Sequence, residues 1–138
     1  MSARQFLLDT NAVIDILRNP QGMVARRLVE NGGVDSCAIS DITLYELYTG
    51  AYASQYVRKN IAAVERLTDW LSVLPSSRAY KEAARQKVAL QAKGQIIEDV
   101  DILIGSTAIV SKRILVTSNT NHLGRLEGIK ITDWTTEG

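Results

Sequence analysis

Residues 98–118, EDVDILIGSTAIVSKRILVTS, combine the two patterns that predict the fold. From 102 to 110 no residue carries a charge, which is typical of a helix that is buried on all sides. The run RILVTS at 113–118 is short and largely apolar, which favours a buried strand. A buried helix followed directly by a buried strand is typical of a parallel sheet that is covered by helices on both faces.

The same alternation recurs along the rest of the chain. Strands are predicted at 5–9, 34–40, 72–75, 113–118 and 129–134. Helices are predicted at 11–19, 22–31, 42–52, 56–72, 77–92 and 99–111. The residues NTNH, which follow the fourth strand, are predicted to form a polar loop. We therefore expect one α/β domain over residues 1–138 with a central parallel sheet.

Composition limits the classes of protein to consider. The 138 residues are 46% hydrophobic, which suffices for a core without disulfides. Sixteen Lys and Arg residues against fifteen Asp and Glu residues leave a net charge of +1, so any polyanion must bind to a local patch. The single cysteine, Cys37, excludes an internal disulfide and fits a reducing compartment. No stretch approaches the ~20 apolar residues of a membrane span. We expect a cytoplasmic protein without a membrane partner.

Polar residues end three of the predicted strands. Asp9 closes the first strand, Ser40 the second, and Ser118 with Asn119 the fourth. Ligands of open parallel sheets bind beyond the carboxyl ends of the strands. These residues are therefore expected to share one site, although they are far apart in the sequence.

Three carboxylates stand at the start of the buried helix: Glu98, Asp99 and Asp101. A helix N-terminus stabilises an anion by about 0.3–1 kcal/mol, which accounts for one acid better than for three. A hard divalent cation accounts for them better, because Mg²⁺ accepts one or two carboxylates completed by water. Asp101 is the main candidate ligand, Asp99 is a helix cap or an additional acid, and Glu98 is expected in solvent.

Two further acids are candidates for the same site. Asp9 is expected to be free for ligand binding, because Thr10 and Asn11 can cap the helix that follows it. Glu46 lies between large apolar residues on the helix at 42–52, and Gly50 one turn later is expected to allow another element to approach closely.

The remaining charged residues have ordinary surface explanations. The single histidine, His122, lies in the predicted loop and has no partner for a zinc site. Asp15 is expected to face solvent and to pair with Arg18, three residues later. The basic residues around the last strands are weaker candidates for contacts with phosphates: Lys112, Arg113 and Arg125.

Four segments, in order, resemble the PIN-domain family, and the VapC-type toxins of toxin–antitoxin pairs in particular. The segments are LLDTNAVIDIL (7–17), ISDITLYELYTGA (39–51), IIEDVDILIGSTAI (96–109) and ILVTSNTNHLGRLEGIKITDW (114–134). This resemblance implies a three-layer α/β/α sandwich with a parallel sheet and a Mg²⁺- or Mn²⁺-dependent endoribonuclease. It also implies a homodimer and a cognate antitoxin that blocks the acidic pocket, often with a basic side chain.

The resemblance assigns roles to particular residues. The catalytic and metal-binding acids are Asp9, Glu46 and Asp101, with Asp99 at a position that is often acidic too. The polar residues at the end of the fourth strand are Thr117, Ser118 and Asn119. With Ser40 and His122, they are expected to contact the substrate or to support the acids. His122 departs from part of the family, in which a fourth acid often occupies its place.

Other readings of the same residues differ in what they require. A phospho-acceptor receiver domain needs an acidic pair after the first strand, and this chain has one acid there. A phosphatase with an aspartate nucleophile needs a second aspartate, and DTN at 9–11 lacks it. A PIN fold that only binds RNA or a protein remains as the alternative, and Mg²⁺-dependent cleavage separates it from the nuclease.

Overall fold

The computed structural model describes residues 5–136, and their strands form one five-stranded parallel sheet. The strand order is β3–β2–β1–β4–β5, so the first strand occupies the centre. The strands are β1 (Phe6–Leu8), β2 (Cys37–Ser40), β3 (Ser72–Leu74), β4 (Ile114–Val116) and β5 (Ile131–Thr132). All four pairings are parallel, which confirms the predicted sheet.

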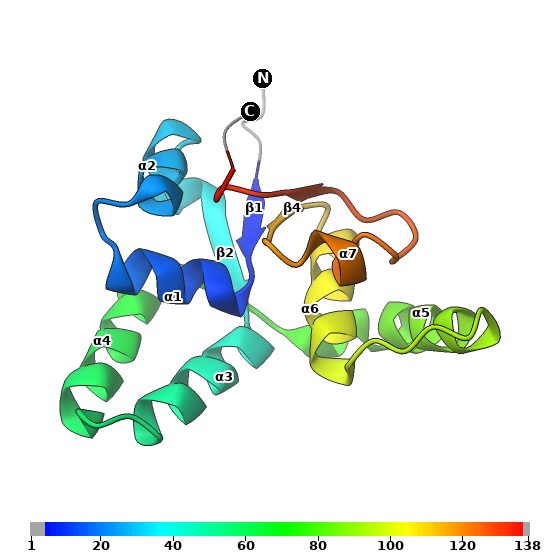
Figure 1. The fold of residues 1–138 in the computed structure, drawn as a ribbon, viewed down its shortest axis with the longest axis horizontal. Coiled ribbons are helices and arrows are strands. Elements are labelled where there is room, and N and C mark those ends of the chain that lie inside the picture. Colours follow the sequence, from blue (N-terminus) through cyan, green and yellow to red (C-terminus); the bar gives the residue numbers. More distant parts are fainter. Residues whose placement is uncertain (1–4, 137–138) are drawn as a thin grey trace.

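Helices cover the sheet on both sides (Figure 1). On one side lie α1 (Thr10–Arg18), α2 (Met23–Glu30) and α4 (Val57–Trp70), and α3 (Asp41–Tyr52) runs from the end of β2 toward α4. On the other side lie α5 (Tyr80–Ala92), α6 (Asp99–Val110) and the short α7 (Thr120–Leu123). This is the three-layer sandwich that the sequence predicted. No helix among the described residues has the length and apolar character needed to cross a membrane.

The side chains of β1 alternate between the two layers, which explains why the sheet has a separate core on each face. Phe6 and Leu8 belong to the core shared with α1, α2, α3 and α4, where the Phe6 ring packs on Trp134 at a centroid distance of 5.1 Å. Leu7 points the other way, into the core formed with α5 and α6. All three β1 side chains are buried, so the central strand fixes both layers at once.

Helix α6 packs closely against the segment that follows it on the same face. A methyl group at Gly105 would lie 2.3 Å from Leu126 Cδ1 and 3.4 Å from Leu123 Cδ2, so a larger residue there would force the Leu126 side chain to move. The buried side-chain amide of Gln86 on α5 holds the same segment through two hydrogen bonds with the backbone of Glu127, at 2.8 and 3.0 Å. The position of α7 is therefore set by α5 and α6.

Three predicted boundaries were wrong for local reasons. Residues Val34–Ser36 form a 3₁₀ turn, in which the Ser36 hydroxyl bonds to the Gly33 carbonyl at 2.9 Å, so β2 begins at Cys37. Most of the predicted loop NTNH lies in helix α7. Its preceding residue, Asn119, is fixed by a hydrogen bond from its N–H to the Thr117 hydroxyl at 2.9 Å. Residues 77–79 belong to a 3₁₀ turn before α5.

Candidate active site

The predicted site residues that end β1, β2 and β4 do lie at one edge of the sheet. Asp9 directly follows β1, and its backbone N–H donates to the Val116 carbonyl of β4 at 3.0 Å. Thr117 follows β4 and is 1% exposed, and Ser40 at the end of β2 is fully buried. Ser40 caps α3 by accepting a hydrogen bond from the Ile42 N–H at 3.1 Å. Its role is therefore to fix the start of α3.

Asp9 is buried, and its carboxylate both caps helix α1 and remains available to a ligand. Its Oδ1 accepts a hydrogen bond from the Ala12 N–H at 2.8 Å, so Asp9 itself is the N-cap of α1. The prediction that Thr10 or Asn11 would cap this helix was wrong, because Asp9 itself is the cap. A carboxylate has about four acceptor sites, so Asp9 can cap the helix and still bind a ligand. Burial raises the pKa of Asp9, and the hydrogen bond from Thr117 opposes this increase.

Glu46 reaches the site from α3 and is held by α1. The Thr10 hydroxyl lies 2.5 Å from Glu46 Oε1 and 3.2 Å from the Thr43 hydroxyl, which is fully buried. The carboxylate is the stronger acceptor, so Thr10 donates its proton to Glu46. The charge of Glu46 further raises the pKa of Asp9. Gly50 has no neighbouring atom within 4 Å of an added methyl group, so the close approach predicted there was wrong.

Asp101 reaches the site from the first turn of α6. Burial raises its pKa most, and the charges of Glu98 and Glu46 raise it further. The imidazole of His122 acts in the opposite direction and lowers the pKa of Asp101, so α7 brings this exposed histidine close to the acid. Asp101 in turn raises the pKa of Asp9. Three elements thus bring like charges together, which opposes their ionisation.

The donor set fits a hard divalent cation. Among residues 5–136, no three side chains of His, Cys, Asp or Glu are arranged to hold one ion together. Mg²⁺ does not require three, because it accepts one or two carboxylates and keeps several waters. Asp9 and Asp101 supply such a pair. Glu46 Oε1 is already bonded to Thr10, which suits Glu46 better to contact with water than to direct ligation.

The other charged residues that the sequence singled out lie outside the acidic site. Asp99 is exposed and pairs with Lys87 Nζ of α5 at 2.8 Å, so its carboxylate is turned away from Asp9. Glu98 is exposed, as expected. Arg113 precedes β4 and donates to the Phe6 carbonyl at 3.2 Å, at the amino end of the sheet. Residues before a parallel strand lie at the edge opposite the carboxylates, so Arg113 and the adjacent Lys112 lie away from the acidic site; their contact with phosphates stays a prediction.

The sequence analysis missed the supporting roles of Thr10 and Thr43. Thr10 was interpreted only as a helix cap, although it stands between Asp9 and Asn11 in the motif DTN. Thr43 lies three residues before Glu46, on the same face of α3. The three-residue spacing of Thr43 and Glu46 was the signal in the sequence that the two side chains lie together.

Comparisons with known proteins agree with this geometry. The family model described as PIN domain matches residues 6–128. The chain is 30% identical over 131 residues to "Ribonuclease VapC1" of Haemophilus influenzae (strain R2866), and 31% identical over 131 residues to "tRNA(fMet)-specific endonuclease VapC" of Shigella flexneri. Each alignment covers 94% of this chain and 98% of the relative.

Solved structures show the same fold. The DNA-bound VapBC complex of Salmonella typhimurium contains a chain with a TM-score of 0.87 and 32% identity, covering 95% of this chain and 98% of that one. The VapBC-1 complex of nontypeable Haemophilus influenzae gives a TM-score of 0.83 at 28% identity, with the same coverage.

Proposed function

Because this chain belongs to the PIN-domain family, we propose that it is a metal-dependent endoribonuclease and the toxin of a toxin–antitoxin pair. The observation that carries the proposal is the set of carboxylates at the carboxyl edge of the sheet. Asp9, Glu46 and Asp101 come from three different elements, and the pKa values of Asp9 and Asp101 are raised in part by neighbouring carboxylates. Such an arrangement is unfavourable for the fold alone and favourable for binding a cation.

The cofactor in this proposal is Mg²⁺ or Mn²⁺, held by Asp9 and Asp101 with water completing the shell. When bound, such an ion neutralises charge on the scissile phosphate and lowers the pKa of a water molecule. Cys37 does not compete as a ligand, because it is buried and its pKa is raised by burial.

The protein groups have separate roles in this proposal. Asp9 is held by the start of α1 through Oδ1 and by a hydrogen bond from Thr117, and its remaining acceptor sites are available to the ion. Glu46 is immobilised through Oε1 by Thr10, and Oε2 remains to accept a proton from the attacking water. His122 is exposed beside Asp101 and is placed to donate a hydrogen bond to a phosphate oxygen. Thr117 and Asn119 hold the end of β4 in place beneath Asp9.

The partners in this proposal are RNA, an antitoxin protein and a second copy of the chain. Relatives named as ribonucleases, and solved complexes described as VapBC, support the first two. The tRNA named for the Shigella relative is the first substrate to test. We expect the protein in the cytoplasm, where RNA and a reducing environment are present, and expect poor expression without its antitoxin.

The test is cleavage by the purified full chain. Total RNA and tRNA(fMet) are incubated with Mg²⁺, with Mg²⁺ plus EDTA, and with the variants Asp101→Asn and Asp99→Asn. We expect cuts in the first sample and with Asp99→Asn, and none with EDTA or Asp101→Asn. Cleavage that persists in EDTA contradicts the metal-dependent mechanism. Binding of RNA without cleavage in every sample supports a binding module instead.

A further inference from the structure

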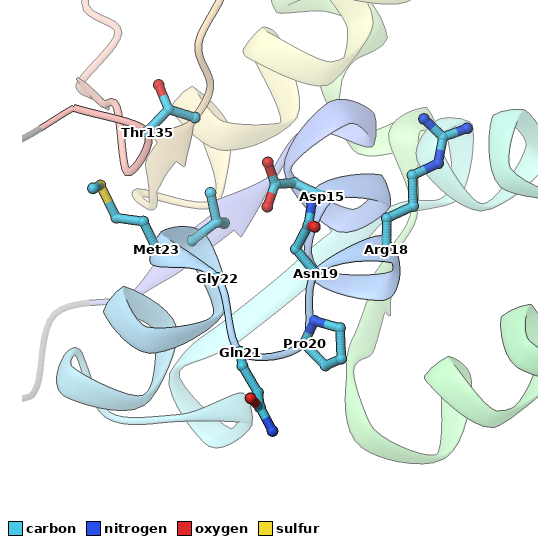
Figure 2. Close-up of a pocket in the computed structure, with 9 residues that line it drawn as sticks. Asp15, Arg18, Asn19, Pro20, Gln21, Gly22, Met23 and Thr135 are labelled. Carbon is cyan, nitrogen blue, oxygen red and sulfur yellow. The ribbon is translucent and has the colours of Figure 1, made fainter.

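A groove along α1 runs from the turn between α1 and α2 to residues that neighbour Asp9. Its outer part is a hollow of about 590 Å³ between that turn and Thr135 (Figure 2). Its inner part is a hollow of about 120 Å³ that reaches Asn11 and Thr117 beside Asp9. Both hollows are lined by Asp15, Val24 and Thr135, so they form one surface. We call this surface the α1–α2 groove.

The turn that forms the groove is compact. The Gly22 N–H donates to the Asn19 carbonyl at 2.9 Å, and the next helix begins at once with a bond from Arg26 N–H to the Gly22 carbonyl at 3.0 Å. A methyl group at Gly22 would lie 2.9 Å from Asn19 Cβ, so the chain folds tightly back on itself there. The hollow is therefore formed before any ligand arrives, as small-molecule sites usually are.

Asp15 is the acid that lines both parts of the groove. It is partly buried, and among residues 5–136 its carboxylate makes no hydrogen bond or ion pair. The predicted pairing with Arg18 was wrong. Figure 2 shows the Asp15 carboxylate on the side of Met23 and Thr135, whereas the Arg18 guanidinium extends the other way. A half-buried carboxylate without a partner is available to accept hydrogen bonds from a ligand.

The polar side chains of the outer hollow favour a ligand that donates hydrogen bonds. Its one acid, Asp15, has no basic partner among the lining residues, because the Arg18 guanidinium extends away from it, and the amides Asn19 and Gln21 line the same space. In the inner part, Asp133 Oδ1 already accepts hydrogen bonds from the N–H and the hydroxyl of Thr135. Amides both donate and accept, and the Met23 and Val24 side chains supply apolar contact. A nucleobase has this combination of a polar edge and an apolar face.

We propose that the α1–α2 groove binds an unstacked base of the RNA next to the cleaved bond, and that Asp15 selects a base presenting amino groups. This inference rests on the proposed ribonuclease function. Asp15 lies six residues after Asp9 on α1, about 9 Å along the helix axis, which suits a nucleotide neighbouring the reacting phosphate. Carboxylates select cytosine through its amino group in nucleic acids, and RNA-binding proteins read unstacked bases at their Watson–Crick edges.

The test measures base preference in a pool of short RNAs with a randomised stretch, cleaved by the full chain with Mg²⁺. The variant is Asp15→Asn, which keeps the size of the side chain and adds donors. The control is Asp69→Asn, an exposed acid on α4 outside the groove. We expect the wild type to prefer an amino-bearing base at one position beside the cut by about tenfold or more, and Asp15→Asn to remove most of that preference. Unchanged base frequencies in Asp15→Asn overturn the proposal.

Two further measurements separate the causes of failure. Binding of four short homopolymeric RNAs in EDTA reports on the groove without cleavage. If the wild type cleaves no RNA but binds one homopolymer better than the others, and Asp15→Asn loses this difference, the base-binding proposal is supported and the ribonuclease proposal is contradicted. Equal binding of all four overturns the groove. Hexa-arginine serves as a probe for a cationic peptide partner. If Asp15→Asn loses binding of hexa-arginine but cleaves RNA with unchanged base frequencies, the groove binds a protein partner and the RNA proposal is overturned.

Discussion

Substituting Asp101→Asn is expected to stabilise the folded protein while abolishing cleavage. Carboxylates perturb one another over about 4–6 Å, and at ~6 Å two charges repel by about 0.7–3 kcal/mol for effective dielectric constants of 80 to 20. Burial is the main cause of the raised pKa of Asp101, and the charges of Glu98 and Glu46 raise it further, so repulsion between carboxylates also acts in the structure. Asn loses an interaction with the N-terminus of α6 of about 0.3–1 kcal/mol. The net gain is about 1 kcal/mol at low salt and neutral pH, or about 2–5 °C in Tm.

The pH dependence of stability predicts the same direction of change for Asp101→Asn. A carboxyl group whose pKa is higher in the folded state binds its proton more tightly there than in the unfolded chain. Asp9 and Asp101 are both raised above the ordinary value of 3.8. Their contribution to the free energy of unfolding is therefore most favourable below that value and is lost as the pH rises through the raised pKa values. Asp101→Asn removes one of these groups, so its gain should be larger at pH 7 than at pH 4.

The assay is thermal unfolding followed by circular dichroism, in EDTA and in Mg²⁺. The wild type should gain about 1.4 kcal/mol at a Mg²⁺ concentration of ten times Kd, and Asp101→Asn should gain much less. Asp99→Asn is the matched control, because Asp99 pairs with Lys87 at the surface and such pairs contribute about 0–1 kcal/mol. It should keep the full Mg²⁺ effect. The reasoning is refuted if Asp101→Asn lowers Tm in EDTA, or if it retains the stabilisation by Mg²⁺.

Four further substitutions test the hydrogen bonds and the packing around the site. Thr10→Val removes the hydroxyl bonded to Glu46 at 2.5 Å and should lower both the cleavage rate and, by about 1.5–3 kcal/mol, the free energy of unfolding in urea. Gly105→Val should lower the free energy of unfolding by about 1–3 kcal/mol through overpacking. Gly50→Ala, whose added methyl group meets open space, should raise it by about 0.5–1 kcal/mol. Equal changes in the free energy of unfolding, measured in urea, would contradict the packing described at Gly105. Gln86→Leu should cost about 1–3 kcal/mol by leaving backbone groups unpaired, and hydrogen exchange should show faster opening of the segment after α7.

The architecture could be predicted because its signals are local. The uncharged run at 102–110 and the short apolar strands show up as hydrophobic patterns, and a parallel sheet brings the ends of its strands to one edge. Asp9 and Ser40 were predicted on that ground; Asp9 directly follows β1 and Ser40 ends β2. The strand order, with β1 in the centre, depends on packing between elements far apart in sequence and was not predicted.

The remaining details depend on atoms that no local pattern specifies. Whether a carboxylate caps a helix or binds a ligand depends on which of its acceptor sites are used; Asp9 caps α1 with Oδ1 and also accepts a hydrogen bond from Thr117. Asp15 was expected to pair with Arg18 from their spacing, but the rotamers separate them. Arg113 was a candidate for phosphate contacts because it lies near the last strands in the sequence, and strand direction puts it at the edge opposite the acids.

The most direct test of the central claim is a crystal structure of the protein grown with Mn²⁺, with the ion located by its anomalous scattering. We expect an anomalous peak between the carboxylates of Asp9 and Asp101, within ligand distance of both, with Glu46 at its periphery. A peak elsewhere on the surface, or none at this edge of the sheet while the same preparation cleaves RNA, would contradict it.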